Sequence, residues 1–533
     1  MKYTYRLRMI VCVSMVWMPA LLLAQWPPAD GFPLADREEQ SNLVKVHPTS
    51  DGGCYVSWFD NADSGYDVYL QRLDAAGNEL WIHNGVKIAN RNMDWTADYG
   101  LDVDADGNAV LAFRDDRFGG VRATVTLVNP AGQRLWGDGV PVSDGLIEAM
   151  RPYVAATTDG GYTVAWSEYG ETTNVVRVQH LNSLGQPQWA SPLLWEDPQF
   201  GQFNMSCVTA SDDGNAIISW VRKGMNFWDP PHLWTQKVSP SGTLLWNPHH
   251  VVVYDGEGGL EPGEFPCHHP DNQGGAIFHW HGALIGNWFD AAYQHILADG
   301  TEKFPHNGIP PTTNTDRQRF DTALTCDLAT GDTYLYWIEL EVIEFIDYFS
   351  VYGQKFDAEG NRLWGDGGIS LVPWDTITLL NPVAEFCDTG GALASWIGYD
   401  LWGQHQIYAA RQDTTGALIW DGQIQQVTET ESYKHNLISA TLTSGMHVVA
   451  WTDDRDGDDD IYIQNIFNDG SMGHCLADLN FDAMVTLSDL AQLLSNYGMT
   501  DGAAFEDGDI DKDGDVDLSD LAALLAVYGM DCD

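Results

Sequence analysis

The sequence is poor in positive charge. It contains 26 lysines and arginines against 76 aspartates and glutamates, a formal net charge of −50. A field of this sign repels nucleic acids and anionic membrane surfaces, which argues against partners of either kind. The acidic residues are spread along the chain rather than collected in a tail, a pattern typical of the solubilising surface of a folded protein.

Local signatures of common catalytic sites are also absent. The sequence has no Gly-x-Ser-x-Gly motif, no phosphate-binding loop and no serine, histidine and aspartate set with a recognisable local pattern. These absences argue against the hydrolases and nucleotide-binding enzymes that depend on such motifs. With 76 acidic residues, any two carboxylates could be proposed as a glycosidase pair, so the sequence alone identifies none.

Long hydrophobic runs are restricted to the first residues. Lys2, Arg6 and Arg8 precede an apolar run over residues 9–23, and Ala24 offers a small residue before a cleavage site at Gln25. This arrangement is typical of a secretory signal peptide, which we place at residues 1–24. The run is shorter than the ~20 residues of a membrane span, so we expect an exported, soluble protein.

One motif recurs eight times between residues 26 and 470. Each copy has two aromatic anchors that repeat every 53 to 60 residues. Between them, apolar and polar residues alternate over short runs separated by Asp-Gly and Gly-Asn turns, which predicts four antiparallel strands per copy. We expect the second strand to end at the first anchor and the fourth to start at the second anchor. The first anchors are Trp58, Phe113, Trp166, Trp220, Trp280, Trp337, Trp396 and Trp451, and the second are Trp26, Trp81, Trp136, Trp189, Trp246, Phe304, Trp364 and Trp420.

This pattern predicts an all-β domain over residues 25–470, an eight-bladed β-propeller of four-stranded blades. Residues 26–36 read as a lone fourth strand, and the last copy, residues 445–469, lacks one. The N-terminal strand should therefore complete the last blade and leave no exposed edge. Seven blades plus an irregular unit is the alternative.

The repeat resembles the Asp-Gly-Gly…Trp…Asp-Ile-Tyr…Leu-Trp units of large secreted bacterial proteins with propeller-like domains. That resemblance implies an architecture and no activity. An Asp-box sialidase is a poor match, because that motif places its aspartate closer to the aromatic residue than the seven positions between Asp159 and Trp166.

Residues 475–533 contain one calcium-loop pattern twice, 31 residues apart. Oxygen side chains at loop positions 1, 3, 5 and 12, with the main-chain carbonyl of position 7, are what a hard cation requires. Apolar residues at helical spacing and a terminal glycine follow each loop, which predicts helices near 487–498 and 518–529. The predicted ligands of two Ca²⁺ ions are Asp478, Asn480, Asp482, Met484 and Asp489 in the first loop and Asp509, Asp511, Asp513, Asp515 and Asp520 in the second.

This segment resembles a type I dockerin, a small α-helical, EF-hand-like module that binds a cohesin domain in a calcium-dependent way. The resemblance implies a cohesin-like partner, recognised by Leu487, Ser488, Leu518 and Ser519. Because both copies carry the same pair, two symmetric docking modes would be available. The sequence departs from the family at Ala483, where a glycine is usual. A calcium-stabilised C-terminal cap without a partner is the alternative.

Cysteine is scarce, and Cys12 lies within the signal peptide. Cys475 and Cys532 stand at the two ends of the dockerin-like module, and the oxidising compartment of an exported protein favours a disulfide between them. The sequence leaves open the pairing of Cys54, Cys207, Cys267, Cys326 and Cys387.

Fourteen of the 22 tryptophans are repeat anchors, which we expect to pack between blades. Others fall in the connections between second and third strands, or between one blade and the next. Both kinds of connection emerge on the same face of a propeller, so these residues are candidates for a carbohydrate or protein ligand face, with loop packing as the alternative. They are Trp95, Trp228, Trp288, Trp374 and Trp402.

Two further clusters have metal-binding residue types. One is a histidine-rich patch near the fifth copy, in which His279 and His281 share one face of a strand, but no ligand spacing is recognisable and chance clustering is favoured. The other is the acidic loop 453–460, which we interpret as a solvated turn rather than another calcium site. The histidine-rich patch comprises His249, His250, Cys267, His268, His269, His279 and His281.

Two functions are compatible with these features. The first is a secreted, non-catalytic binding or structural propeller, tethered through its dockerin-like module and acting in extracellular polysaccharide utilisation. The second is a dockerin-tethered glycoside hydrolase or polysaccharide lyase with its site on the propeller face. The evenness of the repeats favours the first, since an active site usually breaks repeat symmetry. Copies four to six are the irregular ones, so an enzymatic site is expected there.

Overall fold

A computed structural model describes most of residues 26–529. The predicted signal peptide and the predicted cysteine pair Cys475 and Cys532 lie outside the described residues, as do Trp402 and the predicted ligands Asp482, Asp511 and Asp513. The description omits residues 1–25, 28, 64, 76, 198–200, 227, 247–248, 285–287, 400–402, 421–422, 474–476, 481–483, 501–502, 504–506, 511–513, 527 and 530–533.

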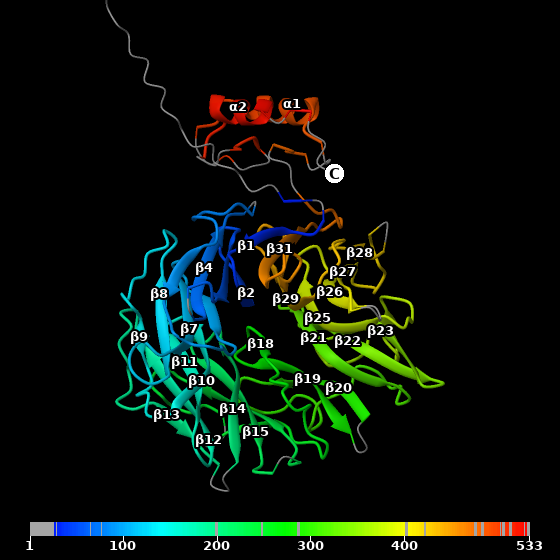
Figure 1. Ribbon diagram of the computed structural model, residues 1–533. Helices are drawn as coiled ribbons and strands as arrows, with labels where there is room; N and C mark the ends of the chain where they lie inside the picture. The colour runs from blue at the N-terminus through cyan, green and yellow to red at the C-terminus, as the bar shows by residue number, and fades with distance from the viewer. Residues whose placement is uncertain are drawn as a thin grey trace, which may run out of the picture.

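Eight antiparallel sheets form a ring, which confirms the predicted eight-bladed propeller (Figure 1). We number the blades from 1 to 8 in the order of their first strands. These first strands lie nearest the centre, and those of neighbouring blades pack against one another, except that the first strand of blade 6 packs against the second and third strands of blade 5. They are β2 (Ser41–Pro48), β6 (Gly100–Val103), β10 (Glu148–Ala156), β14 (Gln202–Ala210), β18 (His268–Pro270), β21 (Gln318–Asp327), β25 (Thr378–Phe386) and β29 (Lys434–Thr441).

Outward from the centre, each blade adds a second and a third strand. The second strands are β3 (Cys54–Asp60), β7 (Ala109–Asp115), β11 (Tyr162–Tyr169), β15 (Ala216–Lys223), β19 (Ala276–Leu284), β22 (Asp332–Ile343), β26 (Ala392–Tyr399) and β30 (His447–Asp453). The third strands are β4 (Asp67–Leu73), β8 (Arg122–Val128), β12 (Asn174–Leu181), β16 (His232–Val238), β20 (Trp288–Ile296), β23 (Ile346–Phe356), β27 (His405–Gln412) and β31 (Asp460–Ile466).

The outer edge is formed by short fourth strands. Blade 5 has three strands, and a single β-bridge between Tyr293 and Ile309 takes the place of its fourth strand. The fourth strand of blade 8 is the N-terminal strand β1 (Phe32–Ala35). The others are β5 (Val86–Ala89), β9 (Val140–Pro141), β13 (Leu193–Trp195), β17 (Val251–Tyr254), β24 (Ile369–Ser370) and β28 (Gln425–Gln426).

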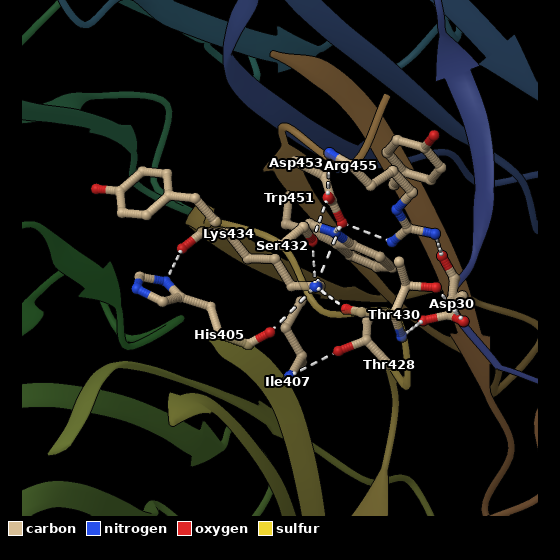
Figure 2. A network of polar contacts seen from close by, with 12 residues as sticks. Asp30, His405, Ile407, Thr428, Thr430, Ser432, Lys434, Trp451, Asp453 and Arg455 are labelled. Carbon is tan, nitrogen blue, oxygen red and sulfur yellow. Dashed lines mark hydrogen bonds and ion pairs between the residues drawn. The ribbon is translucent and has the colours of Figure 1, made fainter. Parts of the chain in front are cut away.

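The ring closes as predicted, because β1 pairs antiparallel with β31 in a register that sets Phe32 opposite Ile463. Figure 2 shows the polar network at this closure. The Asp30 carboxylate accepts hydrogen bonds from the main chain of Glu429 and Thr430 and from the Thr430 hydroxyl, at 2.6 to 2.8 Å. A chain segment from the N-terminus thus joins blades 7 and 8.

Arg455 extends the closure network into the core of blade 8. Its guanidinium donates to the Asp30 carbonyl and to the Asp453 carboxylate, which also accepts from the Trp451 indole and the Ser432 hydroxyl. Asp453 is fully buried. The interpretation of residues 453–460 as a solvated turn is therefore wrong at its first residue, whose carboxylate supports ring closure.

All eight first anchors are at most 1% exposed, as expected for residues that pack between blades. The second anchors link consecutive blades by a different contact. Six of them donate an indole hydrogen bond to a main-chain carbonyl of the following blade, as Trp189 does to Pro240 at 2.8 Å. In blade 1 the fourth strand begins at Val86, after Trp81, so the prediction that the fourth strand starts at the second anchor is wrong.

Five first strands carry a β-bulge with a left-handed residue at its centre. The residues are Leu43, Arg151, Asp321, Asn381 and Asn436, with φ between 45° and 56°. A non-glycine residue rarely adopts this conformation, and bulges of this kind redirect side chains near functional sites. The bulges therefore place four strained polar residues, and Leu43, around the centre of the ring.

Helices α1 (Leu487–Asn496) and α2 (Leu518–Ala526) form the small α-helical part (Figure 1). Thr486 caps α1, and the Asp489 carboxylate accepts a hydrogen bond from the Thr486 main-chain N–H at 2.8 Å, which completes a capping box. The two halves exchange main-chain hydrogen bonds, from Gly498 to Val516 at 2.8 Å and from Gly529 to Val485 at 2.7 Å. Among the described residues, no helix is long and apolar enough to cross a membrane.

Candidate functional site

A pocket of about 270 Å³ opens at the inner rim of blades 5 to 7. We call it the axial pocket. The second strand of blade 5 contributes two histidines, and the bulges of blades 6 and 7 contribute an aspartate and an asparagine. Its lining includes Glu264, Phe265, His279, His281, Asp321, Thr322 and Asn381.

The connection between β17 and β18, residues 255–267, breaks the repeat and covers one side of the pocket. Leu260 forms a bridge to Gly282 of β19, and a disulfide joins Cys267 to Cys207 of β14. The Arg151 guanidinium lies over Phe265, with its Cζ atom 4.0 Å from the centre of the Phe265 ring. These contacts hold Glu261 and Glu264 against β19. The irregular region thus falls in blades 4 to 6, as the sequence indicated.

His281 is buried between two carboxylates of this connection. Its Nε2 atom lies 2.7 Å from Glu261 and its Nδ1 atom 3.2 Å from Glu264. Burial opposes the charged imidazolium, but Glu264, then Glu261 and Asp321, outweigh that effect and raise the pKa of His281 to about 9. His281 is therefore a protonated hydrogen-bond donor at neutral pH.

His279 lies two residues away on the same strand and so shares a face with His281. Its Nδ1 atom lies 2.9 Å from the Thr322 hydroxyl, and it has no carboxylate partner within its described hydrogen bonds. Burial, with the neighbouring His269 and His281, lowers the pKa of His279 to about 3. One face of β19 thus presents a neutral and a charged imidazole side by side, a separation typical of acid–base assignments in catalytic sites.

Of the remaining members of the predicted histidine patch, His269 stacks on His279 with ring centres 5.8 Å apart, and the others have different contacts. Cys267 is consumed in the disulfide, and His268 is buried against the hydroxyls of Thr209 and Ser219. His250 stacks on Trp234 with ring centres 3.9 Å apart. Within the part of the chain that the structure describes, these side chains form no group that could hold a metal ion. Among the described residues, Cys54, Cys326 and Cys387 remain outside any disulfide.

The predicted ligand face is exposed where the structure describes it. Trp228, Trp95 and Trp288 are 79%, 50% and 38% exposed, and Trp374 is half-buried beneath the Arg317 guanidinium. Trp95, Trp228 and Trp374 stand in the predicted connections, whereas Trp288 is the first residue of β20. The β22–β23 hairpin of blade 6 extends further and ends in a fully exposed Phe345. The sequence repeat did not predict the length of this hairpin.

The second of the two predicted calcium loops brings carboxylates together. Oxygen atoms of Asp515, Asp517 and Asp520 all lie within 4.8 Å of one another, a donor set that suits a hard cation. Asp517 was missed by the sequence pattern, which assigned no ligand to that loop position. The buried Asp520 also accepts main-chain hydrogen bonds from Ile510 and Asp517 at 2.7 and 2.8 Å.

The first loop has the same internal scaffold. Buried Asp489 accepts main-chain hydrogen bonds from Leu479, Asn480 and Thr486. Asp478 is also buried, whereas Met484 is exposed at its side chain and would contribute its carbonyl. Among the described residues, the group that suits Ca²⁺ is that of the second loop, Asp515, Asp517 and Asp520.

No family model matches the sequence, and no curated protein matches it. Similar solved structures include a PL25 ulvan lyase bound to -[GlcA(1-4)Rha3S]-, with 9% identity, 86% of this chain and 99% of that chain covered, and a TM-score of 0.44. The polysaccharide lyase Uly1 has 12% identity, 85% and 94% coverage and a TM-score of 0.40. An endo-arabinase from Bacteroides thetaiotaomicron VPI-5482 has 10% identity, 52% and 94% coverage and a TM-score of 0.27. Similarity at this level concerns the fold alone.

Proposed function

We propose that this protein is an exported enzyme that cleaves a polysaccharide at the axial pocket. The observation that carries the proposal is the pairing of His279 and His281 on one face of β19 at the wall of an open pocket. The pocket interrupts the repeat, as a catalytic site would. The strained bulge residues Asp321 and Asn381 in its wall support the same conclusion.

The two imidazoles suit different tasks. His281, protonated between Glu261 and Glu264, can donate its Nε2 proton to the oxygen of a departing sugar once that oxygen displaces the Glu261 carboxylate, which is 46% exposed. His279, kept neutral, can hydrogen-bond a sugar hydroxyl through its second nitrogen. The exposed Trp228, in the β15–β16 connection, and Trp288, the first residue of β20, offer apolar faces to further sugar rings.

A His281→Gln variant of the chain from Gln25 onward tests the enzymatic function. We expect the rate of reducing-end release from the substrate found in a polysaccharide screen to fall by a factor of about 10² or more, because the proton donor is lost. Binding of the same glycan on an array should persist. His306→Gln is the matched control, since His306 is also held between two carboxylates, Glu302 and Asp255, but is half exposed and outside the axial pocket.

Binding without cleavage in the unmodified chain would instead support a non-catalytic polysaccharide-binding propeller. The specific observation in favour of that second function is the exposure of Trp95, Trp228 and Trp288. Cleavage that His281→Gln leaves unchanged would place the active site elsewhere.

We further propose that the C-terminal module binds two Ca²⁺ ions and docks to a cohesin-like partner. Leu487 and Leu518 occupy equivalent first positions of α1 and α2 and are 68% and 67% exposed. Ser488 and Ser519 beside them are exposed as well. Exposed apolar side chains repeated on two helices are typical of a protein interface.

Calorimetry on the full mature chain should detect two Ca²⁺ sites, and capture on immobilised cohesin domains should require Ca²⁺. Asp509→Ala with Asp511→Ala should abolish one site, because loop positions 1 and 3 both lose their oxygen ligands. Leu487→Asp with Leu518→Asp should keep calcium binding and lose capture. Undiminished calcium binding by the first double variant would contradict the assignment of these loops.

A further inference from the structure

The lining of the axial pocket is acidic. Glu264 and Asp321 line it, Glu261 reaches its wall through His281, and the His281 imidazolium is the positive charge they share. Three carboxylates and one imidazolium leave a local charge of −2. The whole chain adds a formal charge of −50 to the field that a substrate crosses.

The cationic side chains of the neighbouring inner strands are already engaged. Arg151 donates to the Met205 carbonyl and the Tyr153 hydroxyl and stacks on Phe265. Asp98 pairs with Arg151 and with Lys45, at 3.4 and 2.6 Å.

Arg319, two residues before Asp321, is 1% exposed and pairs with Asp290 and Glu339. The pocket lining itself, within the described residues, includes no lysine or arginine. A sugar carboxylate or sulfate would therefore enter beside carboxylates whose one neighbouring cation, the His281 imidazolium, is already engaged by Glu261 and Glu264, at a cost that rises with burial.

Glu264 also retains unused hydrogen-bonding capacity. Its Oε1 atom accepts the His281 main-chain N–H at 3.1 Å, whereas its buried Oε2 atom has no hydrogen-bond partner. The Nδ1 atom of His281, whose side chain is 5% exposed, likewise makes no hydrogen bond of good geometry. A buried carboxylate oxygen without a donor is costly unless a ligand supplies one.

We infer that the substrate of the axial pocket is a glycan with free amino groups, whose ammonium binds Glu264 and Asp321. This inference rests on the proposed function for the location of the site, but it concerns the charge of the ligand rather than the bond that is cleaved. An ammonium supplies both the donors that Glu264 lacks and the positive charge that the pocket lacks. The acidic surface would also raise the encounter rate with a polycation.

Calorimetry on the full mature chain with three oligosaccharides of equal length tests this inference: one of glucosamine, one of N-acetylglucosamine and one of galacturonate. We expect the glucosamine oligomer to bind at least about tenfold more tightly than either of the others, the change that one charge-assisted hydrogen bond produces. Glu264→Gln should remove that preference while retaining the side-chain shape. Asp321→Asn is a second variant that leaves the disulfide-bound connection untouched.

Glu257→Gln is the matched control, an exposed glutamate on the same connection. The preference should remain in this variant, and all three variants should melt within a few degrees of the unmodified chain. Equal binding of the acetylated oligomer, or tighter binding of the uronate, would overturn the inference. Preference for glucosamine without cleavage would contradict the enzymatic function and support the inference, whereas cleavage of a uronate would do the reverse.

Discussion

Deletion of residues 25–37 should open the propeller and produce the largest loss of stability of any change considered for this chain. The segment carries strand β1, and its removal leaves the β31 edge unpaired over the Phe32–Ile463 register. It also removes the buried side chains of Trp26, Phe32 and Leu34. At about 2 kcal/mol for each fully buried apolar side chain, this burial alone contributes about 6 kcal/mol.

The deletion acts on the polar network as well. Without Asp30, the Glu429 and Thr430 main-chain donors lose their acceptor, and Arg455 loses one of its two partners (Figure 2). Differential scanning calorimetry and light scattering should show a lower Tm and an earlier onset of aggregation, since an unpaired edge templates strand addition. The control is the chain that starts at Gln25, and Asp30→Ala should fall between the two. An equally stable, monomeric deletion variant would contradict closure by β1.

The fold was predictable because its information is local and repeated eight times. An aromatic residue recurs at one position of every second strand, for example Trp58 in blade 1 and Trp451 in blade 8. Each of these rings is buried by its own blade and a neighbouring blade. The error at the fourth strands has a physical reason. Trp189 is held by a hydrogen bond to Pro240 of the following blade, and a contact between blades leaves no trace in the periodicity that marks a strand.

The site was predictable in part. Alternation along one strand was enough to place His279 and His281 on one face, and irregular copies indicated blades 4 to 6. Their partners were not accessible to the same reasoning, because Glu264 comes from a connection and Asp321 from a bulge in the next blade. Which of many carboxylates meets a given histidine depends on the curvature of the ring. The Cys207–Cys267 disulfide depends on the same geometry.

Trp166→Ala should lower the stability of the propeller by about 3–5 kcal/mol, the usual cost of truncating a buried tryptophan. Trp166 is fully buried and packs between blade 3 and the apolar residues of blade 2, including Val125. Its indole also donates to the Glu168 carboxylate at 3.2 Å. The variant therefore leaves both a cavity between two blades and a buried carboxylate oxygen without its donor.

Trp228→Ala is the matched comparison, because it removes the same ring from a position that is 79% exposed. Its thermal and denaturant stability should stay within about 0.5 kcal/mol of the unmodified chain, whereas glycan binding should weaken if sugars stack on this face. Calorimetry and a glycan array on both variants separate the two roles. A stable Trp166→Ala variant would contradict the anchoring role of the first repeat tryptophan. A destabilised Trp228→Ala variant with unchanged glycan binding would remove Trp228 from the ligand face.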